Sequence, residues 1–212
     1  MRERIQKYKD DVWNKSFLIS FAGALLLLSI SLIINFFAGS FAERSASNPV
    51  TDVILDNTNV WDVDTLFVYG SMMLWVFVGG LLFLKPKYAP YVMKSIALFV
   101  FIRSISISLT HIAPFPGQIN LPDDSVMRFF TFGGDLFFSA HTGLPFLLTL
   151  LFWHKRTIRY VFLTASILFA FVVLLGHYHY SIDVFAAFFI TPTIASLSKF
   201  FFKKEYQSFK VL

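Results

Sequence analysis

The chain alternates between long apolar stretches and short polar segments that carry most of its charges. Six stretches are close to the roughly 20 apolar residues that an α-helix needs to cross a bilayer core about 30 Å thick. They cover residues 17–37, 65–84, 95–112, 136–153, 160–176 and 178–202. The last is the least regular, because it contains Asp183 near its start and Pro192 inside. The pattern predicts an all-α integral membrane protein with six transmembrane helices.

This pattern divides the chain into three parts. We expect a cytoplasmic lead-in at 1–16, a transmembrane catalytic domain at 17–202 and a cytoplasmic tail at 203–212. The first apolar stretch is too long for a signal peptide and follows a segment of mixed charge, so we interpret it as a retained first helix.

The composition excludes an ordinary soluble domain. Apolar residues make up 56% of the 212 residues and charged residues 15%, whereas soluble domains carry about 25% charged residues. The mean hydropathy is +0.65. The absence of cysteine removes disulfides, thiol chemistry and thiolate metal ligands from consideration.

The charges predict the orientation of the helices. Most of the 18 Lys and Arg fall within 1–15, 85–94, 155–159 and 199–210, on one side if all six stretches cross. Most of the 13 acids fall on the other side. The positive-inside rule then places both termini in the cytoplasm. Topology thus explains the net charge of +5, and we expect no nucleic-acid partner.

Ionisable residues inside or beside membrane helices are costly and are therefore candidates for function. They are Arg103, His111, His141, His177, His179 and Asp183, with Asp135 at the start of the fourth apolar stretch. For His111 and His177 a hydrogen bond between helices is an equally good explanation. His154 lies in a basic loop, which indicates a topology or interface residue.

His179 and Asp183 form the most informative pair. Their spacing of four residues places both side chains on one helix face, where a carboxylate can orient an imidazole. His141 enters from the same side on the fourth helix, and Arg103 on the third can bind phosphate oxygens. A less favoured alternative for Arg103 is a structural role as the ionic partner of Asp183 or Asp135. Asp135 can equally be a helix cap or a catalytic residue, and the two roles are compatible.

Two histidines, a carboxylate and a cation suit phosphoryl transfer through a phosphohistidine. One histidine attacks phosphorus while the other protonates the leaving alkoxide. The site is expected just below the extracytoplasmic surface, at the depth of a phospholipid headgroup.

Four segments resemble the sphingomyelin synthase family. Residues 134–142 (GDLFFSAHT) and 179–184 (HYSIDV) match its two histidine motifs. Weaker similarity covers Arg103 to Gly117 and 49–56 (PVTDVILD). The resemblance extends over about 49–190, with two departures. Ala140 replaces the usual glycine, and Val173 stands where ordinary phosphatases of the superfamily carry an arginine.

The resemblance implies a PAP2-like helical core, and the small size favours a bacterial member in the cytoplasmic membrane. It implies that His179 is the nucleophile, Asp183 its orienting partner and His141 the general acid and then base, with Asp135 supporting His141. The substrates would be a glycerophospholipid donor and a ceramide or diacylglycerol acceptor. No cofactor or metal is expected, and a homo-oligomer is compatible with the sequence.

Two other functions remain open. A lipid phosphatase or phospholipase C-like hydrolase would use the same residues with water as acceptor. A transporter or a zinc protein would use His141, His177, His179 and Asp183 as ligands, but residues 177 and 179 would point apart on a helix. The acids Asp52, Asp56, Asp62 and Asp64 either attract a cationic headgroup or simply follow the topology.

Overall fold

The structure is a computed structural model that describes residues 14–117 and 136–211. Within these ranges it contains seven α-helices, two 3-10 helices and no strand. In chain order they are α2 (Lys15–Arg44), η1 (Leu55–Asn57), α3 (Asp64–Leu84), η2 (Pro86–Tyr88), α4 (Ala89–Leu109), α5 (Ala140–Leu151), α6 (Arg156–Leu175), α7 (Ser181–Phe201) and α8 (Lys203–Lys210). The all-α prediction therefore agrees with the described part of the chain.

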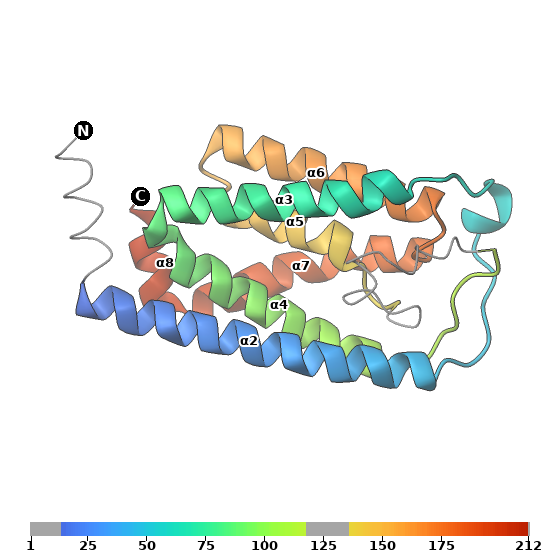
Figure 1. Ribbon diagram of the computed structural model, residues 1–212, viewed down its shortest axis with the longest axis horizontal. Helices are drawn as coiled ribbons and strands as arrows, with labels where there is room; N and C mark the ends of the chain where they lie inside the picture. The colour runs from blue at the N-terminus through green and yellow to red at the C-terminus, as the bar shows by residue number, and fades with distance from the viewer. Residues whose placement is uncertain (1–13, 118–135, 212) are drawn as a thin grey trace.

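The long helices lie side by side in one elongated bundle (Figure 1). Helix α2 packs along α4, α5 packs against both α6 and α7, and α3 contacts α6. The start of α2 and the short helix α8 lie at one end of the bundle, and η1 lies at the other (Figure 1). The bundle thus has one end near η1 and an opposite end near α8.

The main apolar core forms where α4, α5 and α7 meet. Phe99 of α4 is fully buried, and its ring meets the edge of Phe138 at a centroid distance of 5.2 Å. Gly143 lets α5 come this close, because a Cβ there would lie 2.6 Å from the Phe99 ring. This packing fixes the start of α5 against α4.

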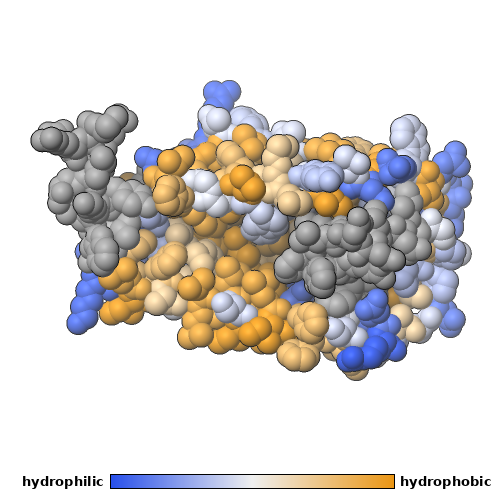
Figure 2. Space-filling view, in the orientation of Figure 1, coloured by the Kyte–Doolittle hydropathy of each residue, from blue (hydrophilic) through white to orange (hydrophobic). Residues whose placement is uncertain are grey.

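The helix surfaces support a multi-pass membrane protein. Five helices are long and apolar enough to cross a bilayer: α2, α3, α4 with η2, α6 and α7. In the most apolar part of α2 only 11% of residues are buried, compared with 50% in α4. On the face shown in Figure 2, apolar side chains cover much of the length of the bundle, and hydrophilic residues gather toward its ends. Lipid chains would cover the exposed apolar sides.

The fourth predicted helix, 136–153, differs from the structure. Helix α5 has only 12 residues, which rise about 18 Å and fall short of a bilayer core. Ser139 caps its start by accepting a hydrogen bond from Thr142 N–H at 3.4 Å. The apolar residues before the cap form no helix. The described residues thus contain five helices long enough to span a bilayer and one shorter apolar helix, and they do not confirm six spans.

Two other predicted helices are longer in the structure. Helix α2 continues beyond residue 37 to Arg44, because small residues such as Ala38 and Ala42 pack in the interior. Helix α4 starts at Ala89 and not at residue 95, since Pro90 is tolerated in the first turn of a helix. Which side of the membrane each end faces stays a prediction.

Candidate active site

His179 and Asp183 are in contact, as their spacing predicts. His179 lies just before α7 and Asp183 in its first turn. The Nδ1 atom of His179 is 3.1 Å from Oδ2 of Asp183. Asp183 is fully buried and His179 is 5% exposed. A histidine–carboxylate pair is therefore held inside the protein at the start of a membrane helix.

The surroundings of His179 determine its tautomer. Nδ1 is also 3.2 Å from the carbonyl oxygen of Leu136. Both neighbours of Nδ1, a carboxylate and a carbonyl, can only accept a hydrogen bond. In the neutral ring Nδ1 therefore carries the proton and donates it, and Nε2 has the free lone pair. This is the form of imidazole that acts as a nucleophile.

Asp183 also ties together the starts of α5 and α7. Its Oδ2 accepts a hydrogen bond from the Tyr180 N–H at 3.1 Å. Its carbonyl oxygen accepts one from the Ser139 N–H, at 3.2 Å. The N-terminal ends of the two helices therefore lie next to His179. Both ends carry partial positive charge, and together they favour an anion at this place.

Arg103 is buried in α4 beside the same region, with 4% of its surface exposed. Its Nε donates to the carbonyl oxygen of Phe138 at 2.8 Å, and Nη1 lies 3.5 Å from Oδ1 of Asn35 on α2. Its charge interacts with those of His141 and Asp183. Arg103 therefore adds a fixed positive charge to the region around the two histidines.

His141 reaches the region from the first turn of α5. It interacts electrostatically with His179 and Arg103. Its ring packs on Phe67 of α3, with ring centroids 4.3 Å apart. It also lines a cavity of about 60 Å³ together with Ser71 and Trp75 of α3. The buried Ser71 hydroxyl finds no hydrogen-bond partner among the described residues. It is therefore available to form a hydrogen bond with a group in the cavity beside His141.

Asp52 has a role that the sequence analysis missed. It lies in the segment before α3, yet its Oδ2 accepts a hydrogen bond from the Ser181 N–H at 2.7 Å. Its Oδ1 accepts from the Ile54 and Leu55 N–H groups at 2.9 and 3.1 Å. Asp52 therefore caps α7 from another part of the chain. The similarity of 49–56 to the synthase segment was the one signal in the sequence that pointed to it.

These hydrogen bonds also set the charge of Asp52. Burial acts to raise the pKa of its carboxyl group. The hydrogen bonds from Ser181, Leu55 and Ile54 act in the opposite direction and prevail, so the pKa lies below its ordinary value. Asp52 is therefore ionised at neutral pH and supports the start of α7 with a full negative charge.

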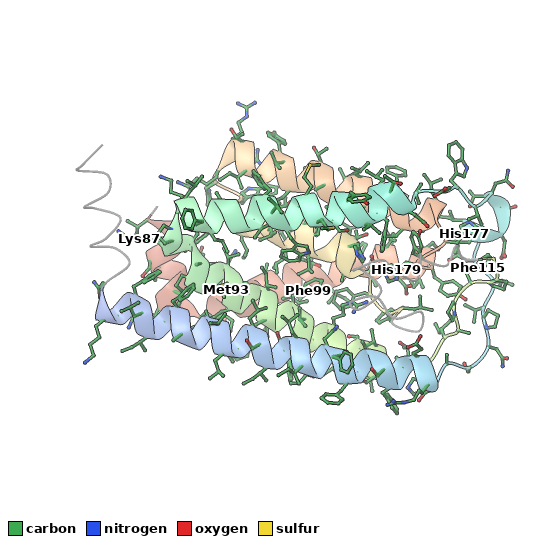
Figure 3. The ribbon with its side chains drawn as sticks, viewed as in Figure 1. Lys87, Met93, Phe99, Phe115, His177 and His179 are labelled. Atoms are coloured by element: carbon green, nitrogen blue, oxygen red, sulfur yellow. The ribbon has the colours of Figure 1, made fainter. Side chains whose placement is uncertain are left out.

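Two of the candidate histidines belong to other surroundings. His111 Nε2 is 3.2 Å from the carbonyl oxygen of Ser108, and its ring packs on Phe41 of α2. His177 is 3.4 Å from the Thr58 hydroxyl, and its ring meets Phe115. Figure 3 shows His177 beside Phe115, beyond His179 toward the end of the bundle. Neither contact is a hydrogen bond between membrane helices, because Ser108 lies three residues before His111 and Thr58 follows the 3-10 helix η1.

The remaining site predictions concern Asp135 and metal binding. Asp135 lies outside the described residues. In the described ranges, no three His, Cys, Asp or Glu side chains come together in a way that would hold a metal ion. The zinc hypothesis thus gains no support from the residues whose positions are described.

A protein-family model matches the part of the chain that contains this site. Residues 133–200 match the model of the PAP2 superfamily C-terminal domain. The match covers about a third of the chain and includes His141, His179 and Asp183. No curated protein and no solved structure matches the chain. The match supports a PAP2-like protein, and it suggests a function of the lipid phosphatase or phosphotransferase type.

Proposed function

We propose that the chain is a membrane lipid phosphotransferase. It would move a phospho-headgroup from a glycerophospholipid to ceramide, diacylglycerol or another lipid alcohol through a phosphohistidine. The observation that carries the proposal is the arrangement at His179, where Asp183 and Leu136 hold the proton on Nδ1 and leave Nε2 as the nucleophile. The PAP2 match over this region supports the same chemistry.

In the first step, Nε2 of His179 attacks the phosphorus of the donor lipid. A nitrogen–phosphorus bond forms, and the bond from phosphorus to the diacylglycerol oxygen breaks. His141 gives its proton to this oxygen, so the alcohol leaves neutral. The positive charge that develops on His179 is stabilised by Asp183 through Nδ1.

In the second step, His141 takes the proton of the acceptor hydroxyl group. The acceptor oxygen then bonds to phosphorus while the nitrogen–phosphorus bond breaks, which restores His179. The cavity beside His141 and the unpartnered Ser71 hydroxyl offer a place for the acceptor hydroxyl. Arg103 and the N-terminal ends of α5 and α7 stabilise the phosphoryl oxygens in both steps.

A lipid phosphatase or phospholipase C-like hydrolase is the second candidate. It would share the first step and pass the phosphoryl group to water. The PAP2 match is equally compatible with this outcome. The largely apolar lining of the cavity beside His141 favours a lipid acceptor over water.

The test uses purified protein in vesicles with a headgroup-labelled phospholipid, with and without ceramide or diacylglycerol. We expect a new labelled phospholipid only when the acceptor is present, and none with His179→Gln. His177→Gln is the matched control, because it removes a buried histidine two residues away that does not contact Asp183. A labelled water-soluble product alone would show a hydrolase. Equal products from native protein and His179→Gln would refute the assignment.

The two-histidine mechanism also makes a prediction about pH. One histidine must be neutral and the other protonated at the same time, so the rate should pass through a maximum. A rate that stays flat from about pH 5 to pH 9 would exclude this mechanism, even if a transfer product is formed.

The proposed location is a bacterial cytoplasmic membrane, with the site near the extracytoplasmic face. The chain contains no cysteine, so single-cysteine variants can report the orientation in intact cells. A membrane-impermeant maleimide should label Thr58→Cys at the His179 end and leave Lys204→Cys at the α8 end unlabelled. The reverse pattern would place the site on the cytoplasmic side.

A further inference from the structure

A second cavity lies at the opposite end of the bundle from His179. Its volume is about 250 Å³, and residues from the end of α5, the last turns of α7 and the short helix α8 line it. Figure 1 shows α8 at the end of the bundle where α2 begins. Its polar lining consists of His154, Ser196, Lys199, Tyr206 and Lys210. We call it the lysine pocket. No residue of the proposed active site takes part in it.

The lining of the lysine pocket is basic. It contains two lysines and a histidine, and no carboxylate lines it in the described part of the chain. Lys199 is held over the ring of Tyr206, with its Nζ 5.8 Å from the ring centroid. Two ammonium groups that share a concave surface create a positive potential there, which attracts an anion.

The single acid of α8 does not neutralise this charge. Glu205 is bound elsewhere: its Oε1 lies 2.5 Å from Nζ of Lys94 and accepts a hydrogen bond from the Ser20 hydroxyl at 2.7 Å. Burial would raise the pKa of Glu205, but the bonds to Lys94 and Ser20 prevail and lower it. Its negative charge is therefore committed to α4 and α2, on another side of the short helix.

The rest of the lining is apolar. Trp153, Pro192 and Phe209 contribute to it beside the lysines. A pocket with basic groups on one wall and apolar groups on the other fits an amphiphile. Its volume lies below the roughly 300–1,000 Å³ of pockets for whole drug-sized ligands, so it suits a headgroup better than an entire lipid.

We infer that the lysine pocket binds the phosphate headgroup of an anionic phospholipid. Two lysines supply charge, and the Tyr206 hydroxyl supplies a further donor, which matches the several acceptor oxygens of a phosphate ester. The apolar wall receives the glycerol and the first part of the acyl chains. Free phosphate shares the charge and the oxygens of this ligand but has nothing to place against that wall.

The test measures binding to the full chain in a detergent with an uncharged headgroup. The probes are dioctanoyl phosphatidic acid, dioctanoyl phosphatidylcholine and inorganic phosphate, each titrated while thermal unfolding is followed. We expect saturable stabilisation by phosphatidic acid and little by the other two. In Lys199→Gln/Lys210→Gln the Kd should rise by about tenfold or more, since each lysine near a lipid surface contributes about 1 kcal/mol.

Lys203→Gln/Lys204→Gln is the matched control. It removes the same charge from the same end of the bundle, but neither residue lines the pocket. Its Kd should change by less than about twofold, and unliganded variants should unfold like the native protein. Equal losses in both double variants would overturn the inference. Tight binding of inorganic phosphate, lost only in Lys199→Gln/Lys210→Gln, would keep an anion site but reject the lipid.

Discussion

Two buried histidines that are two residues apart in the chain occupy very different surroundings. His177 is 3% exposed and His179 is 5% exposed. At His179, a carboxylate and a carbonyl oxygen both lie within 3.2 Å of Nδ1. At His177, Nε2 has a long contact of 3.4 Å with Thr58, and Nδ1 has no partner among the described residues. Burial is shared, whereas the pairing with a carboxylate is not.

This difference shows what a catalytic histidine requires. Burial alone removes water and favours the neutral ring. Only acceptors placed at one nitrogen determine the tautomer and stabilise the positive charge that forms during attack. His177 therefore serves as a natural comparison for His179, and four predictions test how far the two regions differ.

The largest effect after loss of His179 itself is expected from Asp183→Asn. The amide keeps the size of the side chain but removes the charge that stabilises the histidinium. We expect kcat to fall by about 10²- to 10⁴-fold, with little change in KM for the donor lipid. Initial rates at saturating donor and acceptor measure it. A loss below about threefold would mean that Asp183 is only a helix cap.

Asp52→Asn should have a smaller effect, because Asp52 acts on the start of α7 and not on phosphorus. Loss of a charged hydrogen bond costs about 1.5–3 kcal/mol. If half of this free energy is lost at His179 in the transition state, kcat falls by about three- to tenfold. Asp62→Asn, an exposed acid of the same segment, is the control. Asp52→Glu should restore part of the rate, and equal effects of Asp52→Asn and Asp62→Asn would reject the positioning role.

Asp52 also predicts a dependence of stability on pH. Its pKa in the folded protein lies below the unfolded value of about 3.9. The ionised carboxylate therefore stabilises the fold above that pH, and this contribution is lost as the pH falls through the folded-state pKa. Thermal unfolding in mild detergent should show native protein and Asp52→Asn converging in acid. A constant gap between them down to about pH 3 would contradict this.

The smallest effect on turnover is expected for His177→Gln, at less than about twofold. Its effect should appear in stability instead. Burial lowers the pKa of His177, and Asp52 and Thr58 offset this only in part. Since the unfolded value is about 6.5, the unfolded chain binds more protons below that pH, and stability falls as the pH falls. His177→Gln should flatten this decline between about pH 6.5 and pH 5, as followed by thermal unfolding.

Much of the bundle could be predicted from apolar runs, but its ends could not. The run 65–84 and α3 (Asp64–Leu84) agree closely, because charges and polar residues bound both. The run 136–153 is also apolar, but its backbone becomes helical only at Ala140. The carbonyl groups of Leu136 and Phe138 bind His179 and Arg103 instead of helix partners. The hydropathy of the side chains does not indicate which group accepts or donates a hydrogen bond at each backbone carbonyl, so it does not predict where this helix begins.

The candidate site was predictable to a similar degree. The contact of His179 with Asp183 follows from their spacing, even though His179 lies before the helix. The bond from Asp52 to Ser181 joins residues 129 apart in the chain. Such a pairing depends on how the segment before α3 folds over α7, and no local pattern in the sequence expresses it.

The shortness of α5 sets the depth of the candidate site. Helix α5 rises about 18 Å, whereas α3, α4 and α7, with 21 residues each, rise about 32 Å. Leu150 and Leu151, at the far end of α5, line the lysine pocket, so its other end stops well short of the bundle's opposite edge. No residue of α5 is exposed, so packed neighbours and not lipid surround the polar backbone there, which is the condition under which non-helical backbone is tolerated at membrane depth. The short helix thus holds the residues around His179 below the edge of the bundle while hydrocarbon is kept away from them.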